Sequence, residues 1–237
     1  MFNSSIIFVM LMLVASQAQA INWKGIFIAG DHSIENFDNA REDLTQTFSS
    51  IGQLNTLQFS SSTNYISEKN SVYPATFQSI KSGFSQMALR DGEGCLIHMT
   101  SHGGYRRGFY MSLEKTQFMT PRDLIAMVDS ACGQAPTVIL VSACYSGQFI
   151  TEKMKGPNRV IMTAAREDRP SFGCSADIEY TYWDGCLLET IPSARSWPDL
   201  YEKVKVCISA KELALGAKPS EPQAFFGDNT KQWPLLH

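Results

Sequence analysis

The chain has 237 residues, of which 44% are hydrophobic and 18% charged, and its formal net charge is −3. These values are ordinary for a globular protein. The slightly acidic balance excludes the basic surface that nucleic-acid-binding domains usually carry, so we expect no nucleic-acid partner.

The amino-terminal segment has the pattern of a secretory signal peptide. Its apolar stretch, 6–14, is too short for the ~20 residues of a membrane-spanning helix. The small-x-small sequence Ala18-Gln19-Ala20 then provides a cleavage site. We therefore predict a signal peptide at 1–20 and one domain at 21–237, secreted or periplasmic. No second long apolar run follows, so no membrane association is expected after signal removal.

Apolar runs and helical periodicity alternate along the rest of the chain. Apolar runs predict buried strands at 24–30, 94–101, 136–143 and 158–165, and a weaker strand is predicted at 53–59. Helices are predicted at 37–51, at 73–92 (opened by Pro74), at 121–132 (with Thr120 as N-cap), and over most of 179–216. This alternation predicts right-handed βαβ units, and hence a mainly parallel sheet between two layers of helices.

Six cysteines are present, and none forms a CxxC pair. We expect no metal site and no cofactor, because the spacing does not fit structural zinc. If one thiol is kept free for catalysis, the other five cannot all pair, so at least one further free cysteine is expected. The pairing itself stays open.

Two predicted strands end in chemically notable residues. His102-Gly103-Gly104 follows 94–101, and Cys144 follows the run that begins at Val138. A predicted crossover helix separates them, so the two strands should be parallel neighbours whose carboxyl ends share one edge of the sheet. Either residue alone would be typical of a protein core. Together they indicate a thiol and an imidazole that can meet.

Such a pair suits nucleophilic attack on a carbonyl group. The imidazole of His102 can take the thiol proton and later protonate the leaving amine. The N–H groups of Gly103 and Cys144 can stabilise the oxyanion. A strand-to-helix turn at 144–149 would place Cys144 at a helix amino end, which lowers a thiol pKa. His98, inside its strand, is interpreted as a core histidine, whereas His32 could line the same cleft.

The motifs MTSHGG and VSACYSG are similar to those of the legumain (asparaginyl endopeptidase) family of caspase-like cysteine peptidases, particularly its exported bacterial members. Further similar segments are IAGDHSIENFDNARED, MTAAREDRPSFGC, EYTYWDGCLLE and PSEPQAFFG. The resemblance implies a caspase-like three-layer α/β/α sandwich. It also implies that His102 is the general base, that Cys144 is the nucleophile, and that the N–H groups of Gly103 and Cys144 form the oxyanion hole.

The resemblance also implies an asparagine that orients the imidazole, with Asn36 and Asn39 as candidates. Legumains bind the substrate side chain in a pocket with an arginine and acidic walls. The corresponding candidates in this sequence are Asp38, Arg41, Ser142, Ser171 and Asp184. Asp38 stands where the family has its arginine, and Ser142 where it has an acid. The two carboxylates, Asp38 and Asp184, raise the hypothesis of a preference for a basic substrate residue.

We therefore expect an exported cysteine endopeptidase that hydrolyses peptide or protein substrates through a Cys–His dyad and a thioester acyl-enzyme. A transamidase or peptide ligase with the same dyad is the nearest alternative. A catalytically lapsed caspase-like binding protein is the other. The oligomeric state, the cleavage-site preference and the activation route stay open.

Overall fold

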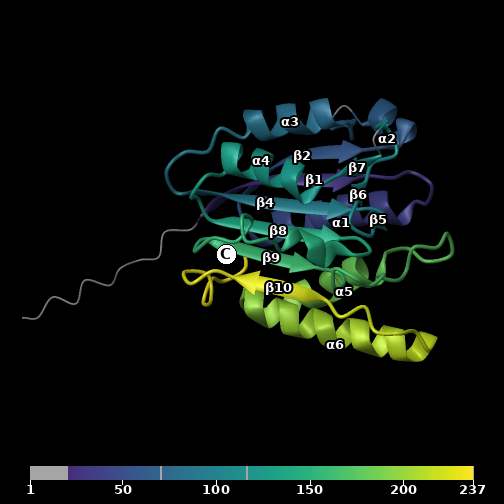
Figure 1. Cartoon of the computed structure of the whole chain (residues 1–237). Coiled ribbons are helices and arrows are strands. Elements are labelled where there is room, and N and C mark those ends of the chain that lie inside the picture. Colours follow the sequence, from purple (N-terminus) through teal and green to yellow (C-terminus); the bar gives the residue numbers. More distant parts are fainter. Residues whose placement is uncertain (1–20, 70, 116, 237) are drawn as a thin grey trace, which may run out of the picture.

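The computed structural model describes residues 21–69, 71–115 and 117–236 (Figure 1). The predicted signal peptide, residues 1–20, lies outside the described residues.

Within the described residues, the centre of the molecule is a seven-stranded sheet with the order β10-β9-β8-β4-β1-β2-β3 (Figure 1). Its strands are β1 (Asn22–Ala29), β2 (Leu54–Ser60), β3 (Val72–Pro74), β4 (Glu93–Thr100), β8 (Thr137–Ser142), β9 (Arg159–Thr163) and β10 (Gln223–Phe226). All neighbouring strands are parallel except β10, which runs antiparallel to β9 at one edge. A small second sheet contains β5 (Gly103–Gly104), β6 (Gly108–Tyr110) and β7 (Phe118–Met119).

Helices cover both faces of the large sheet. They are α1 (Asn36–Ile51), α2 (Thr63–Glu68), α3 (Phe77–Gln86), α4 (Pro121–Ala131), α5 (Tyr182–Thr190) and α6 (Trp197–Leu215), with 3-10 turns η1 (Ser146–Phe149) and η2 (Ile191–Ser193). Helices α3 and α4 pack on one face, and α1, α5 and α6 on the other (Figure 1). The predicted three-layer α/β/α sandwich with a mainly parallel sheet is confirmed.

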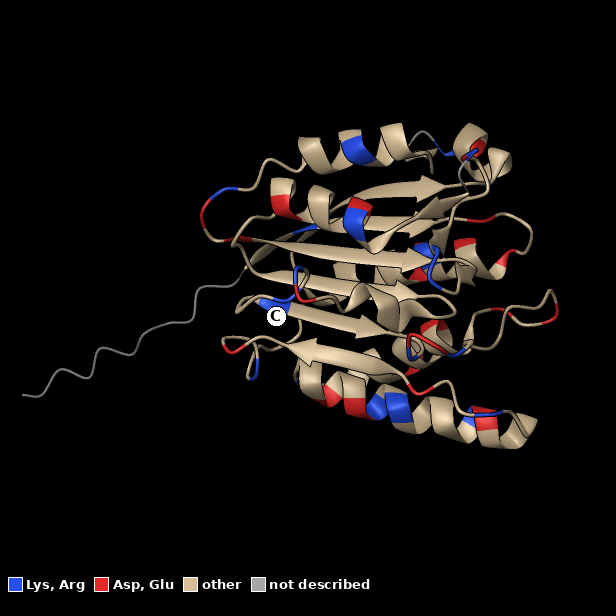
Figure 2. Cartoon of the chain, viewed as in Figure 1, with Lys and Arg blue, Asp and Glu red and all other residues tan. Residues whose placement is uncertain are grey.

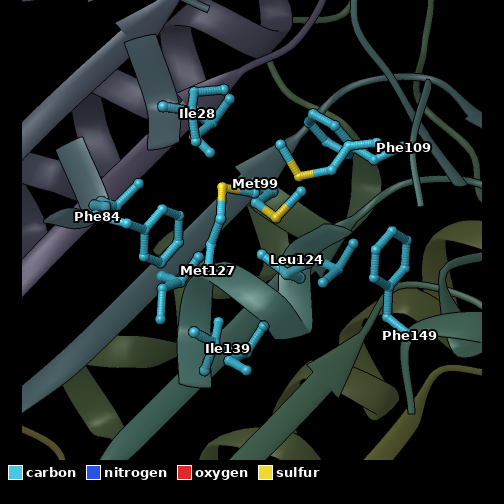
Figure 3. Packing of buried hydrophobic residues seen from close by; sticks show 14 of the residues in the cluster. Ile28, Phe84, Met99, Phe109, Leu124, Met127, Ile139 and Phe149 are labelled. Carbon is cyan, nitrogen blue, oxygen red and sulfur yellow. The ribbon is translucent and has the colours of Figure 1, made fainter. Parts of the chain in front are cut away.

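Alternate residues of each central strand enter the two cores, which explains the continuous apolar runs. In β1, Ile26 and Ile28 join the core under α3 and α4, while Phe27 joins the core under α1, α5 and α6. Figure 3 shows the first of these cores, where Phe84 and Leu124 pack with the β4 and β8 side chains. The charged residues lie mainly in the helices and loops (Figure 2).

The helix predicted at 73–92 is shorter in the structure. Pro74 ends the edge strand β3, where the missing N–H costs no ladder hydrogen bond. The helix begins at Phe77, because the Thr76 side chain caps it by accepting from the Ser79 N–H. At the other end, Ala88 has a positive φ of 39°, which is incompatible with continued helix. None of the described helices combines the length and the apolarity needed to cross a bilayer.

The described residues form two disulfides, one between the sheet and a helix and one between two helices of the same layer. Cys95 of β4 pairs with Cys132 at the end of α4, and Cys186 of α5 pairs with Cys207 of α6. Cys144 and Cys174 are free, which confirms that more than one thiol stays unpaired.

The double substitution Cys95→Ala with Cys132→Ala should lower the free energy of unfolding by about 3–4 kcal/mol, because the bond closes a long loop in the unfolded chain. Urea denaturation under non-reducing conditions measures this loss, with Cys174→Ala as the matched free-thiol control. Equal stability of the double variant and the control would contradict the assignment of this disulfide as a major stabilising link.

Candidate active site

The structure brings His102 and Cys144 to adjacent loops at one edge of the sheet. Strands β4 and β8 are parallel neighbours, and Thr100 lies opposite Ser142 as their last pair. His102 and Cys144 each follow those residues by two positions. The Ser101 N–H donates to the Ser142 carbonyl at 3.1 Å, so the two chains stay together beyond the strands. The predicted arrangement of the two strands is confirmed.

The two loops touch directly. A Cβ atom on Gly103 would lie only 1.9 Å from the carbonyl oxygen of Cys144, so only glycine permits this approach. The side-chain amide of Gln148 donates to the Gly104 carbonyl at 3.1 Å and to the Tyr145 carbonyl at 2.9 Å. These contacts hold the histidine loop and the cysteine loop side by side.

Two N–H groups at this junction are outside the regular ladders. The Tyr110 N–H donates to the His102 carbonyl at 2.9 Å, which makes Gly103 and Phe109 a non-hydrogen-bonded antiparallel pair. The Gly103 N–H is therefore not used by that ladder. Within the described residues, the Cys144 N–H also has no backbone acceptor. Both groups are thus available to an incoming oxygen atom.

The imidazole of His102 has a defined setting. Phe37 packs edge-on against the His102 ring, with ring centroids 5.2 Å apart. The His102 side chain remains 43% exposed. Its Nε2 lies 3.7 Å from Oδ2 of Asp31. Because Nε2 faces the carboxylate, Nδ1 is the ring nitrogen left for another partner.

Neither predicted orienting asparagine is hydrogen-bonded to His102 in the described residues. Asn36 donates from Nδ2 to the Gly173 carbonyl at 2.7 Å, and its buried Oδ1 has no partner. Asn39 donates to the Glu179 carbonyl at 3.2 Å. Both amides instead attach α1 to the segment that precedes α5.

The thiol of Cys144 is half-buried and lies against Ser171. The Ser171 N–H donates to Sγ at 3.3 Å, and the Ser171 hydroxyl lies 3.6 Å from the same sulfur. The thiol in turn donates to the Ser171 carbonyl at 3.6 Å. At the predicted strand-to-helix turn, 144–149, Tyr145 adopts a left-handed conformation (φ 59°), and the helix that follows is the short 3-10 helix η1.

The other free thiol, Cys174, differs from Cys144. Burial raises the pKa of Cys174 to about 12, and the nearby negative charges of Cys144, Asp184 and Asp31 act in the same direction. Cys174 is therefore protonated near neutral pH and is a poor nucleophile.

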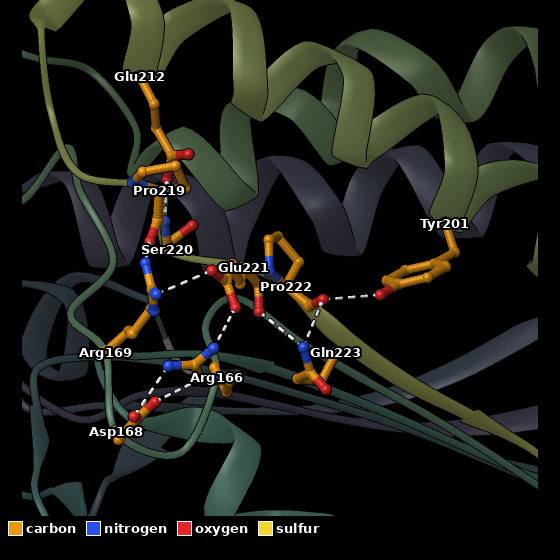
Figure 4. Close-up of polar contacts among 10 residues, drawn as sticks. All are labelled: Arg166, Asp168, Arg169, Tyr201, Glu212, Pro219, Ser220, Glu221, Pro222 and Gln223. Atoms are coloured by element: carbon orange, nitrogen blue, oxygen red, sulfur yellow. Dashed lines mark hydrogen bonds and ion pairs between the residues drawn. The ribbon is translucent and has the colours of Figure 1, made fainter.

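An ion-pair cluster, here called the Glu221 cluster, holds the loop that carries Ser171 (Figure 4). Glu221 binds both Arg166 and Arg169, and the Arg169–Glu221 distance is 2.9 Å. Asp168 binds Arg166 from the other side. The carbonyl of Arg169 in turn accepts from the Tyr145 N–H at 2.8 Å. The loop after β9 is thereby fixed between the carboxyl-terminal segment and the residue next to Cys144.

A buried carboxylate joins the ends of β4 and β8. Oδ2 of Asp184 accepts from the hydroxyls of Thr100 (2.6 Å), Ser142 (2.8 Å) and Thr181 (2.9 Å). Oδ1 of Asp184 lies 3.0 Å from Nε2 of His98. All five side chains are buried, and the Nδ1 atom of His98 has no partner. His98 is therefore a core histidine, as predicted, although only one of its nitrogens is bonded.

Asp38 and Arg41 form a buried ion pair in α1. Arg41 Nε donates to Asp38 Oδ1 at 2.8 Å, and the Ser60 hydroxyl donates to Asp38 Oδ2 at 2.9 Å. Burial raises the pKa of Asp38, although the Arg41 guanidinium opposes the rise. Arg41 also binds Gln58 and lies over the Tyr65 ring, while its buried Nη2 has no partner.

These contacts contradict the hypothesis of a basic substrate residue. The charge of Asp38 is matched by Arg41, and Asp184 is enclosed by its own donors, so neither carboxylate is free to bind a substrate cation. Ser142 is buried with Asp184. Among the five pocket candidates, Ser171 is the one that contacts Cys144.

Sequence reasoning missed Asp31, and it named Asp184 as a pocket residue rather than as the acceptor that joins the two strand ends. Asp31 stood in the sequence directly after a predicted strand, which is the signal that singled out His102. The role of Asp184 carried no comparable signal, because most of its partners are far away in the sequence.

Comparisons with known proteins give a family match and a similar fold. The model of the peptidase C13 family matches residues 65–226. A search of curated proteins finds no match. Among solved structures, caspase-1 from Spodoptera frugiperda is similar, with a TM-score of 0.60 and 13% identity over 87% of each chain. At that identity the likeness shows a shared fold alone.

We predict that Asp184→Ala lowers the free energy of unfolding by at least about 3 kcal/mol, because several buried donors lose their acceptor at once. Urea denaturation followed by circular dichroism measures the effect. The matched control is Asp228→Ala, since Asp228 is exposed and pairs only with Lys231. A stability of the Asp184 variant equal to that of this control would show that the carboxylate does not hold the strands.

A second prediction concerns Glu221→Gln, which keeps the shape of the side chain and removes its charge. The Tyr145 amide and the amides of 166–171 should exchange with deuterium a few-fold faster, because the loop opens more often. Hydrogen–deuterium exchange with mass spectrometry reads this directly. Asp168→Asn is the control, since Asp168 binds Arg166 without reaching the carboxyl-terminal segment. Equal effects of the two substitutions would contradict the role given to Glu221.

Proposed function

Because the chain belongs to the peptidase C13 family and is thus a cysteine-type endopeptidase, we propose that it hydrolyses peptide bonds with Cys144 as nucleophile and His102 as general base. The observation that carries the proposal is the pairing of β4 with β8, which delivers the two residues to touching loops.

The reaction proceeds in two balanced halves. In acylation, the imidazole takes the thiol proton and Sγ of Cys144 attacks the scissile carbonyl carbon. The tetrahedral intermediate collapses, the C–N bond breaks, and the same imidazole proton passes to the leaving amine. A water molecule then attacks the thioester, gives one proton to His102 and releases the acid, and the thiolate recovers that proton.

The N–H groups of Gly103 and Cys144 form the oxyanion hole in this proposal. Both belong to the junction of the two loops, and neither is used by the adjacent ladders. One such donor is typically worth about 10²–10³ in kcat. A side chain at Gly103 would force the loops apart, and the donors with them.

Substrates are peptides or proteins, and we propose that the peptide lies along the loop 166–172, next to Ser171. Preference for asparagine does not carry over from the legumain resemblance, because Asp38 replaces the family's pocket arginine and is paired with Arg41. Arg41 is the basic candidate nearest to that position, and it is buried.

We propose that the enzyme is exported and works outside the cytoplasm, in the periplasm or the medium. Two features support this. Residues 1–20 have a signal-peptide pattern. Two disulfides are typical of oxidising compartments.

Iodoacetamide should label Cys144 at pH 7 and leave Cys174 largely unlabelled, because the pKa of Cys174 is about 12. His102→Ala should slow the labelling of Cys144 and lower kcat/KM on an internally quenched peptide library about 10²–10⁴-fold. Mass spectrometry locates the label, and fluorescence follows the cleavage.

Cys174→Ser is the matched control and should leave labelling and cleavage unchanged. Cleavage that survives in Cys144→Ala, or labelling of Cys144 that is the same with and without His102, would overturn the proposed function. Addition of a peptide with a free amino terminus tests for transamidation, since ligated peptide in excess of hydrolysed product would reveal the alternative reaction.

A further inference from the structure

Asp31 lies just beyond the end of β1, in the position that His102 has beyond the end of β4. Strands β1 and β4 are parallel neighbours, and Ala29 lies opposite Thr100 as their last pair. Asp31 and His102 each follow these residues by two positions, so the register places both at the same edge of the sheet. The 3.7 Å between Asp31 Oδ2 and His102 Nε2 results from this register.

The carboxylate of Asp31 is held in place by its own turn. Its Oδ1 accepts from the N–H groups of His32 at 2.9 Å and Ser33 at 3.4 Å. The Ser33 hydroxyl donates to Oδ2. Asp31 is 4% exposed, so its orientation is set before any substrate arrives.

Two aromatic rings lie next to the imidazole of His102, whose side chain is 43% exposed. The ring of Phe37 packs edge-on against one side of His102, and Tyr110 lies with its ring centroid 6.5 Å away. The Nδ2 groups of Asn36 and Asn39 donate to the Gly173 and Glu179 carbonyls, and neither amide is hydrogen-bonded to His102 in the described residues. Asp31 is therefore the polar group that stands at the Nε2 side of the ring.

We propose that Asp31 is the positioning residue of the dyad and takes the place of an orienting asparagine. It accepts the Nε2–H of His102, which keeps the ring in the tautomer whose bare Nδ1 receives the thiol proton. It also stabilises the imidazolium that forms during acylation. No proton passes to Asp31. The separation of 3.7 Å shortens as the imidazole becomes charged, since hydrogen bonds in ligand-free active sites are often long. The inference rests on the proposed function.

The decisive substitution is Asp31→Asn, because it separates a structural role from a positioning one. The amide oxygen can still accept from the N–H groups of His32 and Ser33, so the turn is preserved. The amide NH₂ then occupies the site of Oδ2 and faces His102 with a donor, which favours the wrong tautomer. We expect kcat on the peptide library to fall about 10²–10⁴-fold with KM little changed. The urea midpoint should stay as in the wild type.

A second readout does not depend on substrate. The rate of iodoacetamide alkylation of Cys144 in Asp31→Asn should fall towards that of His102→Ala. The matched control is Asp91→Asn, because Asp91 is exposed in the loop before β4, at the opposite end of that strand from His102. Asp91→Asn should leave kcat and the alkylation rate of Cys144 unchanged.

A third pair of variants keeps the inference testable if Asp31→Asn does not fold. Asp31→Glu retains a carboxylate and should recover part of the kcat that Asp31→Ala loses, whereas equal losses would contradict the inference. Wild-type kcat and alkylation rate in Asp31→Asn would overturn it too. In those cases the dependence on His102 and Cys144 persists, so the proposed function stands. Loss of that dependence in the wild type would instead remove the proposed function itself.

Discussion

The carboxylate of Asp184 is the constraint on which the arrangement of the site depends. It is fully buried, and a buried charge is tolerated only where hydrogen bonds surround it. Two of its donors, Thr100 and Ser142, are the last residues of β4 and β8. The same carboxylate therefore sets the spacing of the two strand ends from which the proposed base and nucleophile emerge.

Above this buried layer, the site is built from loops whose positions are fixed by close contacts. Gly103 allows the histidine loop to lie against the peptide of Cys144, and the Glu221 cluster fixes the loop that carries Ser171. Two cores pack on the faces of the sheet, and the Cys95–Cys132 disulfide ties β4 to the end of α4. Variable chemistry on loops over a rigid scaffold is a common way to place reacting groups. In this protein the scaffold determines which residues meet, and the loops determine which atoms face each other.

Much of this arrangement could be predicted from local patterns. Strands covered on both faces produce continuous apolar runs, so the central strands were visible, and the Thr120 cap was readable because Thr120 and Asp123 form a capping box. The pairing of His102 with Cys144 followed from parallel neighbours joined by one crossover helix. What could not be predicted depends on contacts between distant segments. Asp184 stands in the first turn of α5, where an acidic residue is expected for helix stability alone. The four-residue strand β10 gave no periodic signal, and the left-handed conformation of Tyr145 in the turn before η1 had no signal in the sequence.

The central claim is that Cys144, His102 and the two N–H groups form one acyl-transfer site. The most direct test is a crystal structure of the mature protein after reaction with a peptide aldehyde, which forms a hemithioacetal with a nucleophilic thiol. The account predicts a bond from Sγ of Cys144 to the aldehyde carbon. It also predicts that the new oxygen accepts from the N–H groups of Gly103 and Cys144, and that Nδ1 of His102 faces the adduct. An adduct on Cys174, or an oxygen directed away from both N–H groups, would contradict it.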